Sequence, residues 1–452
     1  MNSFSKQRKI IFSLALPIII QNIVAHVQIL FDRAFLGNLD VRYLTVVGNV
    51  MVPFEALLFF YFAAANGITI LVAQNIGAKK FKRAQQLSES SYFYFTLIST
   101  GLFLFWIVGA KAVFSLLGVT GVILKEATVF TQILSVSLIF AGIDISSASI
   151  LQGIGQTKPI MVFGIARSIL NIVLDWLLIF GHMGLPAMGM EGAALATAIA
   201  NVLGSIGLFM TAILSKKLPY RISIKGILSP KWRHCNHMLK LGLPSGLESL
   251  LYYTGLLVLT RLMNRIDDMA VGIFSLINGI QIIGVLIYLG FARASMTVVG
   301  QYWGEKNYRE AKRSALYCLR LSYYITLTCS VIFLTFPHFL IGIFTTDTQV
   351  IDRAVPLLRF IAIFINFDVM NIMMGHAIRA TGDTKWMLYT QIVGTLYVIA
   401  LSSVMIINLN LGLWGMYIVM LSDEIIRAGV NFLRFVKGGN PFRRKMWVEN
   451  AA

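Results

Sequence analysis

The amino-acid sequence predicts an all-α integral membrane protein with twelve transmembrane helices, arranged as two parallel six-helix repeats around a central cavity. Three observations predict this fold class. The 452 residues are 57% hydrophobic and only 13% charged, with a mean hydropathy of +0.76. Several long segments contain no charged residue, and the two halves of the chain resemble each other at a constant offset.

The composition excludes a soluble protein of this length. A soluble domain averages about 25% charged residues, so 13% is too few to cover the surfaces of about three soluble domains. The same composition excludes a disordered chain. The three cysteines, Cys235, Cys318 and Cys329, lack the spacing of a metal site or a redox pair. We therefore expect neither a disulfide framework nor a redox centre.

Uncharged segments locate the helices, because a helix needs about 20 apolar residues to cross the bilayer core. Residues 90–110, 192–215, 269–292 and 321–346 contain no charged side chain. The full sequence predicts helices near residues 13–37, 46–76, 92–117, 129–155, 160–182, 189–214, 239–264, 269–301, 315–344, 355–381, 386–408 and 412–436.

The basic residues predict the orientation of these helices. The termini and alternate loops carry 26 of them, whereas the opposite loops carry four, namely Arg42, Lys125, Arg265 and Arg353. By the positive-inside rule both termini are cytoplasmic, in a multi-pass protein of the plasma or inner membrane. The net charge of +18 is then mostly a consequence of topology, and no nucleic-acid partner is expected.

An internal repeat relates the two halves at an offset of 227 residues. Leu16-Pro17 matches Leu243-Pro244, and Gly155-Gln-Thr-Lys158 matches Gly382-Asp-Thr-Lys385. Six helices per repeat give both halves the same orientation, which is a secondary-transporter architecture. The predicted domains are an N-terminal six-helix lobe at 1–214, a cytoplasmic linker at 215–238, a C-terminal six-helix lobe at 239–437 and a basic cytoplasmic tail at 438–452.

Two acids and an amide lie inside the predicted N-terminal lobe. Asp32 is near the outer end of the first helix, and Asp175 is about 22 Å deep in the fifth at 1.5 Å per residue. Asn171 precedes Asp175 by one helical turn and shares its face. Two carboxylates and an amide oxygen suit a proton or a hard cation such as Na⁺. The alternative is a structural ion pair with Arg33 or Arg167.

The predicted C-terminal lobe carries its acids elsewhere. Glu248 and Asp368 lie close to mid-membrane, and no basic residue is within one helical turn of either. An ionisable residue at this depth is a functional hypothesis by default. Each is therefore a candidate cavity acid, with a neutral, hydrogen-bonded carboxylic acid as the alternative. Their repeat equivalents are Gln21 and Ala141, which predicts that the two lobes have divided the chemistry.

Other acids have simpler interpretations. Asp423 and Glu424 can pair with Arg427 on the same helix, at spacings of four and three residues. Asp267 and Asp268 are expected to be solvated in an outer loop. No nucleotide-binding loop GxxxxGK[ST] and no HExxH motif occurs. We therefore expect no enzyme activity and no cofactor, and no direct use of ATP.

Several short segments, in order, resemble the multidrug and toxic compound extrusion (MATE) family. They are Ala15-Leu-Pro17, Phe31-Asp-Arg-Ala-Phe-Leu-Gly37, Asn171-Ile-Val-Leu-Asp175, Gly192-Ala-Ala-Leu-Ala-Thr197, and Phe367-Asp368 with Gly375-His-Ala-Ile-Arg379. The resemblance implies export of cationic or amphipathic organic compounds in exchange for H⁺ or Na⁺. It implies a cation site at Asp32, Asn171, Asp175 and Thr197, C-lobe cavity acids at Glu248 and Asp368, and a helix bend at Pro17.

Two other functions remain open. A lipid-linked precursor flippase of the related superfamily would favour extra helices and a basic cavity, whereas the acids found here favour cationic substrates. A membrane-embedded transferase would need a clustered catalytic motif, and it would leave the repeat unexplained. The expected partners are small cationic or amphipathic molecules and membrane lipids, and the protein is expected to be a monomer.

Overall fold

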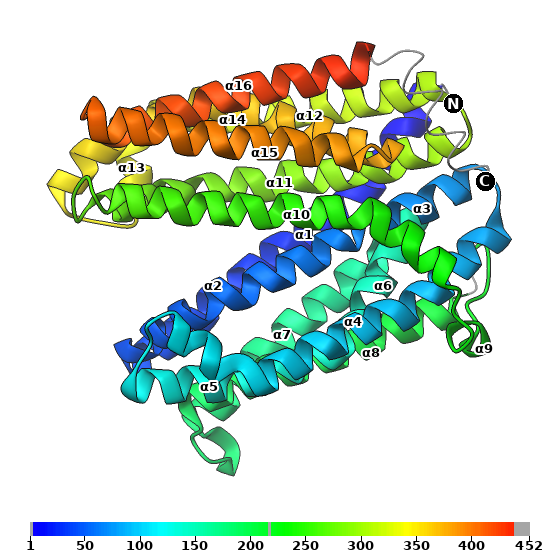
Figure 1. The fold of residues 1–452 in the computed structure, drawn as a ribbon, viewed down its shortest axis with the longest axis horizontal. Helices are drawn as coiled ribbons and strands as arrows, with labels where there is room; N and C mark the ends of the chain where they lie inside the picture. Colours follow the sequence, from blue (N-terminus) through cyan, green and yellow to red (C-terminus); the bar gives the residue numbers. More distant parts are fainter. Residues whose placement is uncertain (1–2, 216–217, 438–452) are drawn as a thin grey trace. The chain divides into compact units, whose positions relative to one another are not determined.

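The computed structural model describes residues 3–215 and 218–437, and within these ranges the chain is helical and contains no strand (Figure 1). The predicted cytoplasmic tail, 438–452, lies outside the described residues. The all-helical membrane architecture expected from the composition is confirmed.

The chain divides into two compact units, and both boundaries fall inside helices. One unit is Ile20–Gly246, and the other contains the described residues of Met1–Ile19 and Leu247–Ala452. The boundaries lie within α1 (Ser3–Leu39) and α10 (Trp232–Met263). They are 227 residues apart, which is the offset of the sequence repeat. Each unit combines most of one predicted lobe, 1–214 or 239–437, with the first part of a helix from the other half. The unit Ile20–Gly246 also includes the described residues of the predicted linker, 215–238.

The unit Ile20–Gly246 packs its helices around several clusters of buried apolar side chains. α4 contacts α5 and α6, and α8 contacts α6 and α7. The helices of this unit, besides parts of α1 and α10, are α2 (Val41–Ala64), α3 (Asn66–Gly77), α4 (Phe81–Leu116), α5 (Gly121–Ser135), α6 (Leu138–Ile154), α7 (Lys158–Phe180), a 3₁₀ turn (His182–Gly184), α8 (Gly189–Leu214) and α9 (Ile224–Ile227).

The second unit has α14 at its centre. α14 contacts α11, α12, α15 and α16, and Ile11, Leu14 and Ala15 of α1 join the same apolar core. The helices of this unit, besides parts of α1 and α10, are α11 (Ala270–Gly304), α12 (Tyr308–Thr335), α13 (Pro337–Gly342), α14 (Thr348–Thr381), α15 (Thr384–Ser403), a π-helical turn (Val404–Asn408) and α16 (Gly412–Lys437).

Glycines allow α10 to approach α2 and α3 closely in the first unit. A side chain on Gly242 would collide with the carbonyl oxygen of Ala64, and one on Gly67 would collide with that of Met238. The first part of α10 is thereby held against the unit Ile20–Gly246. The corresponding first part of α1 packs on α11. There the rings of Phe12 and Phe291 meet edge to face, with their centroids 5.7 Å apart.

Nine helices of the described chain are long and apolar enough to cross a membrane, or ten if α5 and α6, which bend by 48°, form one span. The other two predicted spans correspond to α10 and α16. These helices carry charged residues in their apolar stretches, including Glu248 in α10 and Asp423, Glu424 and Arg427 in α16. The number twelve therefore stays a prediction.

Several helices begin earlier than the uncharged segments predicted. α4 begins at Phe81 and α12 at Tyr308, whereas the sequence predicted starts near 92 and 315. An uncharged segment locates only the part in the bilayer core, but a helix can continue past that part into a segment that carries basic residues. At α12, the Asn307 side chain caps the helix by accepting a hydrogen bond from the Glu310 amide at 3.3 Å.

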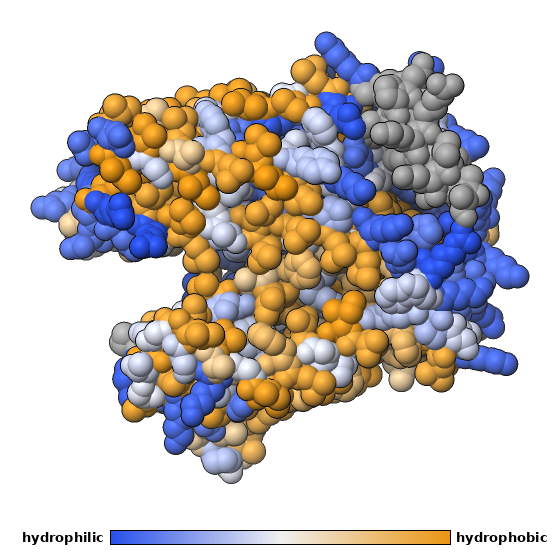
Figure 2. Space-filling model, viewed as in Figure 1, coloured by the Kyte–Doolittle hydropathy of each residue, from blue (hydrophilic) through white to orange (hydrophobic). Residues whose placement is uncertain are grey.

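The outer faces of both units are apolar along the middle of the helices. Figure 2 shows hydrophobic residues over the helix flanks and hydrophilic residues at the helix ends. Near the middle of their helices, Leu97 is 60% exposed and Val393 is 68% exposed. Large apolar side chains this exposed fit contact with lipid rather than with water.

Candidate functional site

The first unit brings together all four residues predicted for the cation site. Asp32 lies on α1, Asn171 and Asp175 on α7, and Thr197 on α8. Gln28, one turn before Asp32, joins them. The i, i+4 spacing places Gln28 with Asp32, and Asn171 with Asp175, on common helix faces.

Hydrogen bonds connect these side chains into one cluster. The carboxyl groups of Asp32 and Asp175 lie close enough to share a proton. Gln28 Nε2 lies 3.5 Å from Asp32 Oδ2 and also donates to Asn171. Asn171 Nδ2 donates to Thr197 Oγ1 at 3.2 Å. With the amide turned over, its nitrogen donates to Asp32 Oδ1 and its oxygen accepts from Thr197 Oγ1, each at 3.2 Å.

The cluster leaves one buried oxygen without a hydrogen-bond donor. Asp175 is fully buried and Asn171 is 1% exposed. Asp175 Oδ1 has no hydrogen-bond partner among the described residues. A buried oxygen without a donor costs free energy, and a proton or a bound hard cation would remove that cost. The arrangement therefore fits either ligand.

The arginines named as alternative partners lie elsewhere. Arg167 pairs with Asp144 on α6, with Nη1 3.2 Å from Oδ2, and the stem of Arg167 packs against Gly204. Arg33 is exposed and forms no ion pair within the described part of the chain. The acids Asp32 and Asp175 are therefore not balanced by an ion pair in this structure.

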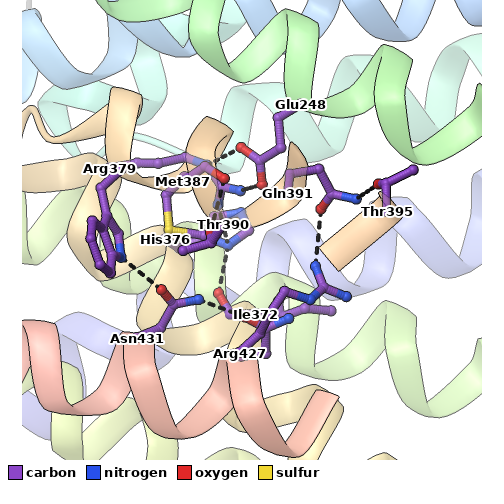
Figure 3. Close-up of polar contacts among 12 residues, drawn as sticks. Glu248, Ile372, His376, Arg379, Met387, Thr390, Gln391, Thr395, Arg427 and Asn431 are labelled. Carbon is purple, nitrogen blue, oxygen red and sulfur yellow. Dashed lines mark hydrogen bonds and ion pairs between the residues drawn. The ribbon is translucent and has the colours of Figure 1, made fainter. Parts of the chain in front are cut away.

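In the second unit, Glu248 has a basic partner that the sequence did not reveal. Arg379 on α14 forms an ion pair with it, with Arg379 Nε also donating to Glu248 Oε2 at 3.3 Å (Figure 3). The interpretation of Glu248 as a carboxylate without a basic neighbour is therefore wrong. It rested on distance along one helix, whereas the partner comes from another. Gly375, one turn before Arg379, leaves room for the guanidinium group.

Asp368 has a neutral partner instead. Tyr288 on α11 donates a hydrogen bond to its carboxylate. No contact between Asp368 and Glu248 occurs among the described residues, so the two C-lobe acids do not form one site here. The tyrosine fits the alternative in which Asp368 is a hydrogen-bonded acid, and it also fits a carboxylate held in place for a ligand.

The predicted pairs in α16 are confirmed. Arg427 contacts Asp423 at 2.7 Å and Glu424 at 2.6 Å, and it donates to Gln391 on α15 at 3.0 Å. Figure 3 shows Arg427 directed toward Gln391, which in turn donates to Thr395 at 3.0 Å. These charges hold α15 and α16 together.

A basic residue in α11 was missed altogether. Arg293 is partly buried, lies eleven residues before the end of the helix, and interacts electrostatically with His376 on α14. His376 also lies 3.5 Å from Arg379. Arg293 forms no ion pair within residues 3–215 and 218–437. It directly follows an uncharged segment, which is the signal that could have identified it as intramembrane.

The chain matches known proteins over nearly its whole length. A family model described as MatE matches residues 17–177 and again 244–405. The two matches begin 227 residues apart, as the repeat requires. A protein of Thermotoga maritima described as a probable multidrug resistance protein NorM is 30% identical over 439 residues, covering 95% of this chain and 92% of its own.

Solved structures share the fold. One titled as the outward-facing conformation of a multidrug resistance MATE family transporter of the MOP superfamily superimposes with a TM-score of 0.90, at 21% identity and 97% coverage of both chains. A MOP superfamily transporter from Pyrococcus furiosus, described as having a binding pocket of reverse polarity, superimposes with a TM-score of 0.89, at 22% identity and 97% coverage of both chains. With the family model matching both halves, this chain is a member of the MatE family of multidrug efflux transporters.

Proposed function

We propose that this transporter is an antiporter that exports cationic or amphipathic organic compounds in exchange for H⁺ or Na⁺ by alternating access. The observation that carries the proposal is the pair of neighbouring carboxyl groups of Asp32 and Asp175, with one buried oxygen, Asp175 Oδ1, that has no hydrogen-bond partner in the described chain. The name of the Thermotoga maritima relative supports export of drugs.

Each residue of the polar cluster in the unit Ile20–Gly246 has a role in this proposal. Asp175 and Asp32 exchange the coupling ion, because a carboxylate accepts either a proton or a hard cation. Asn171 and Thr197 supply further oxygen atoms, and their mutual hydrogen bond fixes the amide. Gln28 orients both Asp32 and Asn171. Pro17, buried within α1 two residues before the unit boundary, is the proposed bend.

The second unit supplies the proposed substrate acids. Asp368 attracts a cationic group, since its described partner is the neutral hydroxyl of Tyr288. Glu248 is already balanced by Arg379 and becomes available only if a substrate group competes with that arginine. Exchange requires that ion and substrate favour different states of the protein, because only differential affinity couples two ligands.

Transport in proteoliposomes tests the proposal. Purified protein is reconstituted, Na⁺ and pH gradients are imposed independently, and uptake of a fluorescent organic cation is measured. We expect one gradient to drive transport and Asp175→Asn to abolish the response to it. Equal transport with and without either gradient, in protein shown to be folded, would contradict ion coupling.

A second candidate is transport of anionic or lipid-linked compounds. The observation that favours it is Arg293, which has no ion-pair partner in the described chain, close to His376. Replacing Arg293 with Gln distinguishes the two candidates. Loss of transport for anionic substrates alone would favour the second, whereas unchanged selectivity would favour the first.

The remaining expectations concern the oligomeric state, membrane location and cofactors of the transporter. We propose a monomer in the cell membrane with both termini in the cytoplasm and no cofactor. The polar clusters contain no arrangement that we associate with catalysis, and transport rather than enzyme activity is the function proposed.

A further inference from the structure

A basic groove lies at the start of α12. Arg309, Lys312, Arg313 and Leu316 line it. Their spacing of three and four residues places all of them on one face of the helix. Three cationic side chains are thus followed, one turn further along, by an apolar one.

Protein contacts use only part of this positive charge. Lys312 donates to the carbonyl oxygen of Val436 near the end of α16, at 3.1 Å. Arg313 lies 3.5 Å from Glu310, and Glu310 also accepts a hydrogen bond from Gln7. Arg309 is exposed and forms no ion pair in the described chain. The groove therefore keeps a positive surplus that suits an anion.

An apolar stripe continues from the groove along α12. Tyr324 is 60% exposed, Leu327 is 53% exposed and Val331 is 59% exposed. With Leu316 they follow the same helix face, and Arg320, also exposed, lies between Leu316 and Tyr324. A ligand that fits the whole face has an anionic head at the end of the helix and an apolar tail along it.

The first repeat shows that this position can be a docking site. The residues equivalent to Lys312, Arg313 and Leu316 are Gln85, Gln86 and Glu89. Glu89 accepts hydrogen bonds from the amide and hydroxyl of Ser223 in the linker, at 3.0 and 3.1 Å, and from Gln85 at 2.9 Å. The acid that holds the linker in one repeat is replaced in the other by a basic, apolar surface.

We propose that the groove at Arg309, Lys312, Arg313 and Leu316 binds the phosphate of an anionic phospholipid, with an acyl chain along the exposed face of α12. Position, charge and shape support this occupant. Clusters of Lys and Arg next to the cytoplasmic end of a transmembrane helix attract anionic headgroups. A free phosphate would use the same basic side chains but would leave the apolar stripe unused.

Native mass spectrometry of the purified full chain tests the proposal. The protein is titrated with phosphatidylglycerol and phosphatidylcholine of identical acyl chains, and the bound lipids are counted. We expect one phosphatidylglycerol to be retained in preference to phosphatidylcholine. Arg309→Gln/Arg313→Gln should weaken that retention by about 25-fold, because each basic side chain contributes about fivefold near an anionic lipid.

A matched variant in the first repeat controls for overall charge. Lys82→Gln/Arg83→Gln removes the same charge from the equivalent helix end and should retain phosphatidylglycerol as the unmodified protein does. Arg309→Gln alone, which breaks no described ion pair, covers the case in which the double variant unfolds. We expect about a fivefold loss from it.

Three results would overturn the proposal. One is equal retention of the two lipids by the unmodified protein. Another is an equal loss in the first-repeat control, which would mean general attraction to positive charge. The third is displacement of the lipid by glycerol 3-phosphate at equal concentration, which would identify the ligand as a soluble phosphate.

Discussion

Arg379 on α14 forms an ion pair with Glu248 on α10, which lies 131 residues earlier in the chain. Each side chain is only 13% exposed. The equivalent positions in the first repeat are Gln21 and Gln152. Both charges therefore occupy positions that are neutral amides in the other half. Removing one of two buried, paired charges leaves the other without compensation.

Replacing one member of this ion pair should destabilise the protein more than replacing both members. We expect Glu248→Gln and Arg379→Gln each to lower the free energy of unfolding by about 3 kcal/mol. The double variant, with two amides as in the first repeat, should recover much of that loss. Thermal or denaturant unfolding in detergent, analysed as a double-mutant cycle, measures the coupling.

Transport by the same variants separates stability from function. If Glu248 also contacts substrates, Glu248→Gln should weaken export to a degree that differs between substrates, even in the stable double variant. Additive single-variant effects on unfolding would show that the ion pair makes no energetic contribution. Equal losses for all substrates, with a lost ion response, would move Glu248 into the coupling site.

The sequence predicted which residues share a helix face, but it predicted contacts between helices poorly. Helical periodicity places Asp175 and Asn171 on one face of α7, and the structure brings Asp32 to them. Gln28 could have been found in the same way, since it is one turn from Asp32. Arg379 could not, because its partner Glu248 is on another helix. Which helices meet depends on tertiary packing, which one sequence does not encode in its local pattern.

Asp32 and Asp175 should be required for transport driven by the coupling ion and not for folding. We expect Asp32→Asn and Asp175→Asn to reach the membrane folded, since the amide keeps the shape of the carboxyl group, and to lose transport driven by the coupling ion. Asp144→Asn is the matched control, because Asp144 is paired with Arg167. It should lower stability while keeping the ion response. Normal gradient-driven export by Asp175→Asn would place the coupling site elsewhere.

The orientation can be tested by labelling single cysteines from outside the cell. In a variant lacking Cys235, Cys318 and Cys329, probes at the exposed positions Asn38 and Leu185 should react with an impermeant maleimide. Probes at the exposed positions Lys82 and Lys225 should react only after permeabilisation. The positive-inside rule gives this expectation, and reaction of Lys225→Cys from outside would reverse the topology.

The loop before α11 contains an acid, Asp267, that is not simply solvated, contrary to the sequence interpretation. Asp267 contacts Arg353 at 2.7 Å, and its hydrogen bond with that guanidinium holds the pKa of Asp267 below its ordinary value of 3.8. A lowered pKa in the folded protein stabilises the fold above the ordinary pKa, and this contribution is lost as the pH falls through the lowered value.

We therefore expect Asp267→Asn to lower stability at pH 7, by less than about 1 kcal/mol because both partners are exposed. The difference from the unmodified protein should disappear as the pH falls below about 3.8. Unfolding in detergent at several pH values measures it. Asp268→Asn, at an exposed neighbour without an ion pair in the described chain, should have no comparable effect.

Pro17 should make α1 easier to bend where it passes from one unit to the other. Proline cannot donate a backbone hydrogen bond and costs about 3 kcal/mol in a helix interior, and Pro17 lies two residues before the boundary at Ile19. We expect Pro17→Ala to keep or raise stability and to slow gradient-driven transport, because the helix resists bending. Pro356→Ala removes a proline from the interior of α14, within one unit, and should leave the rate nearly unchanged. Initial rates in proteoliposomes at equal protein content measure both. Equal rates for Pro17→Ala and the unmodified protein would show that transport needs no bend at Pro17.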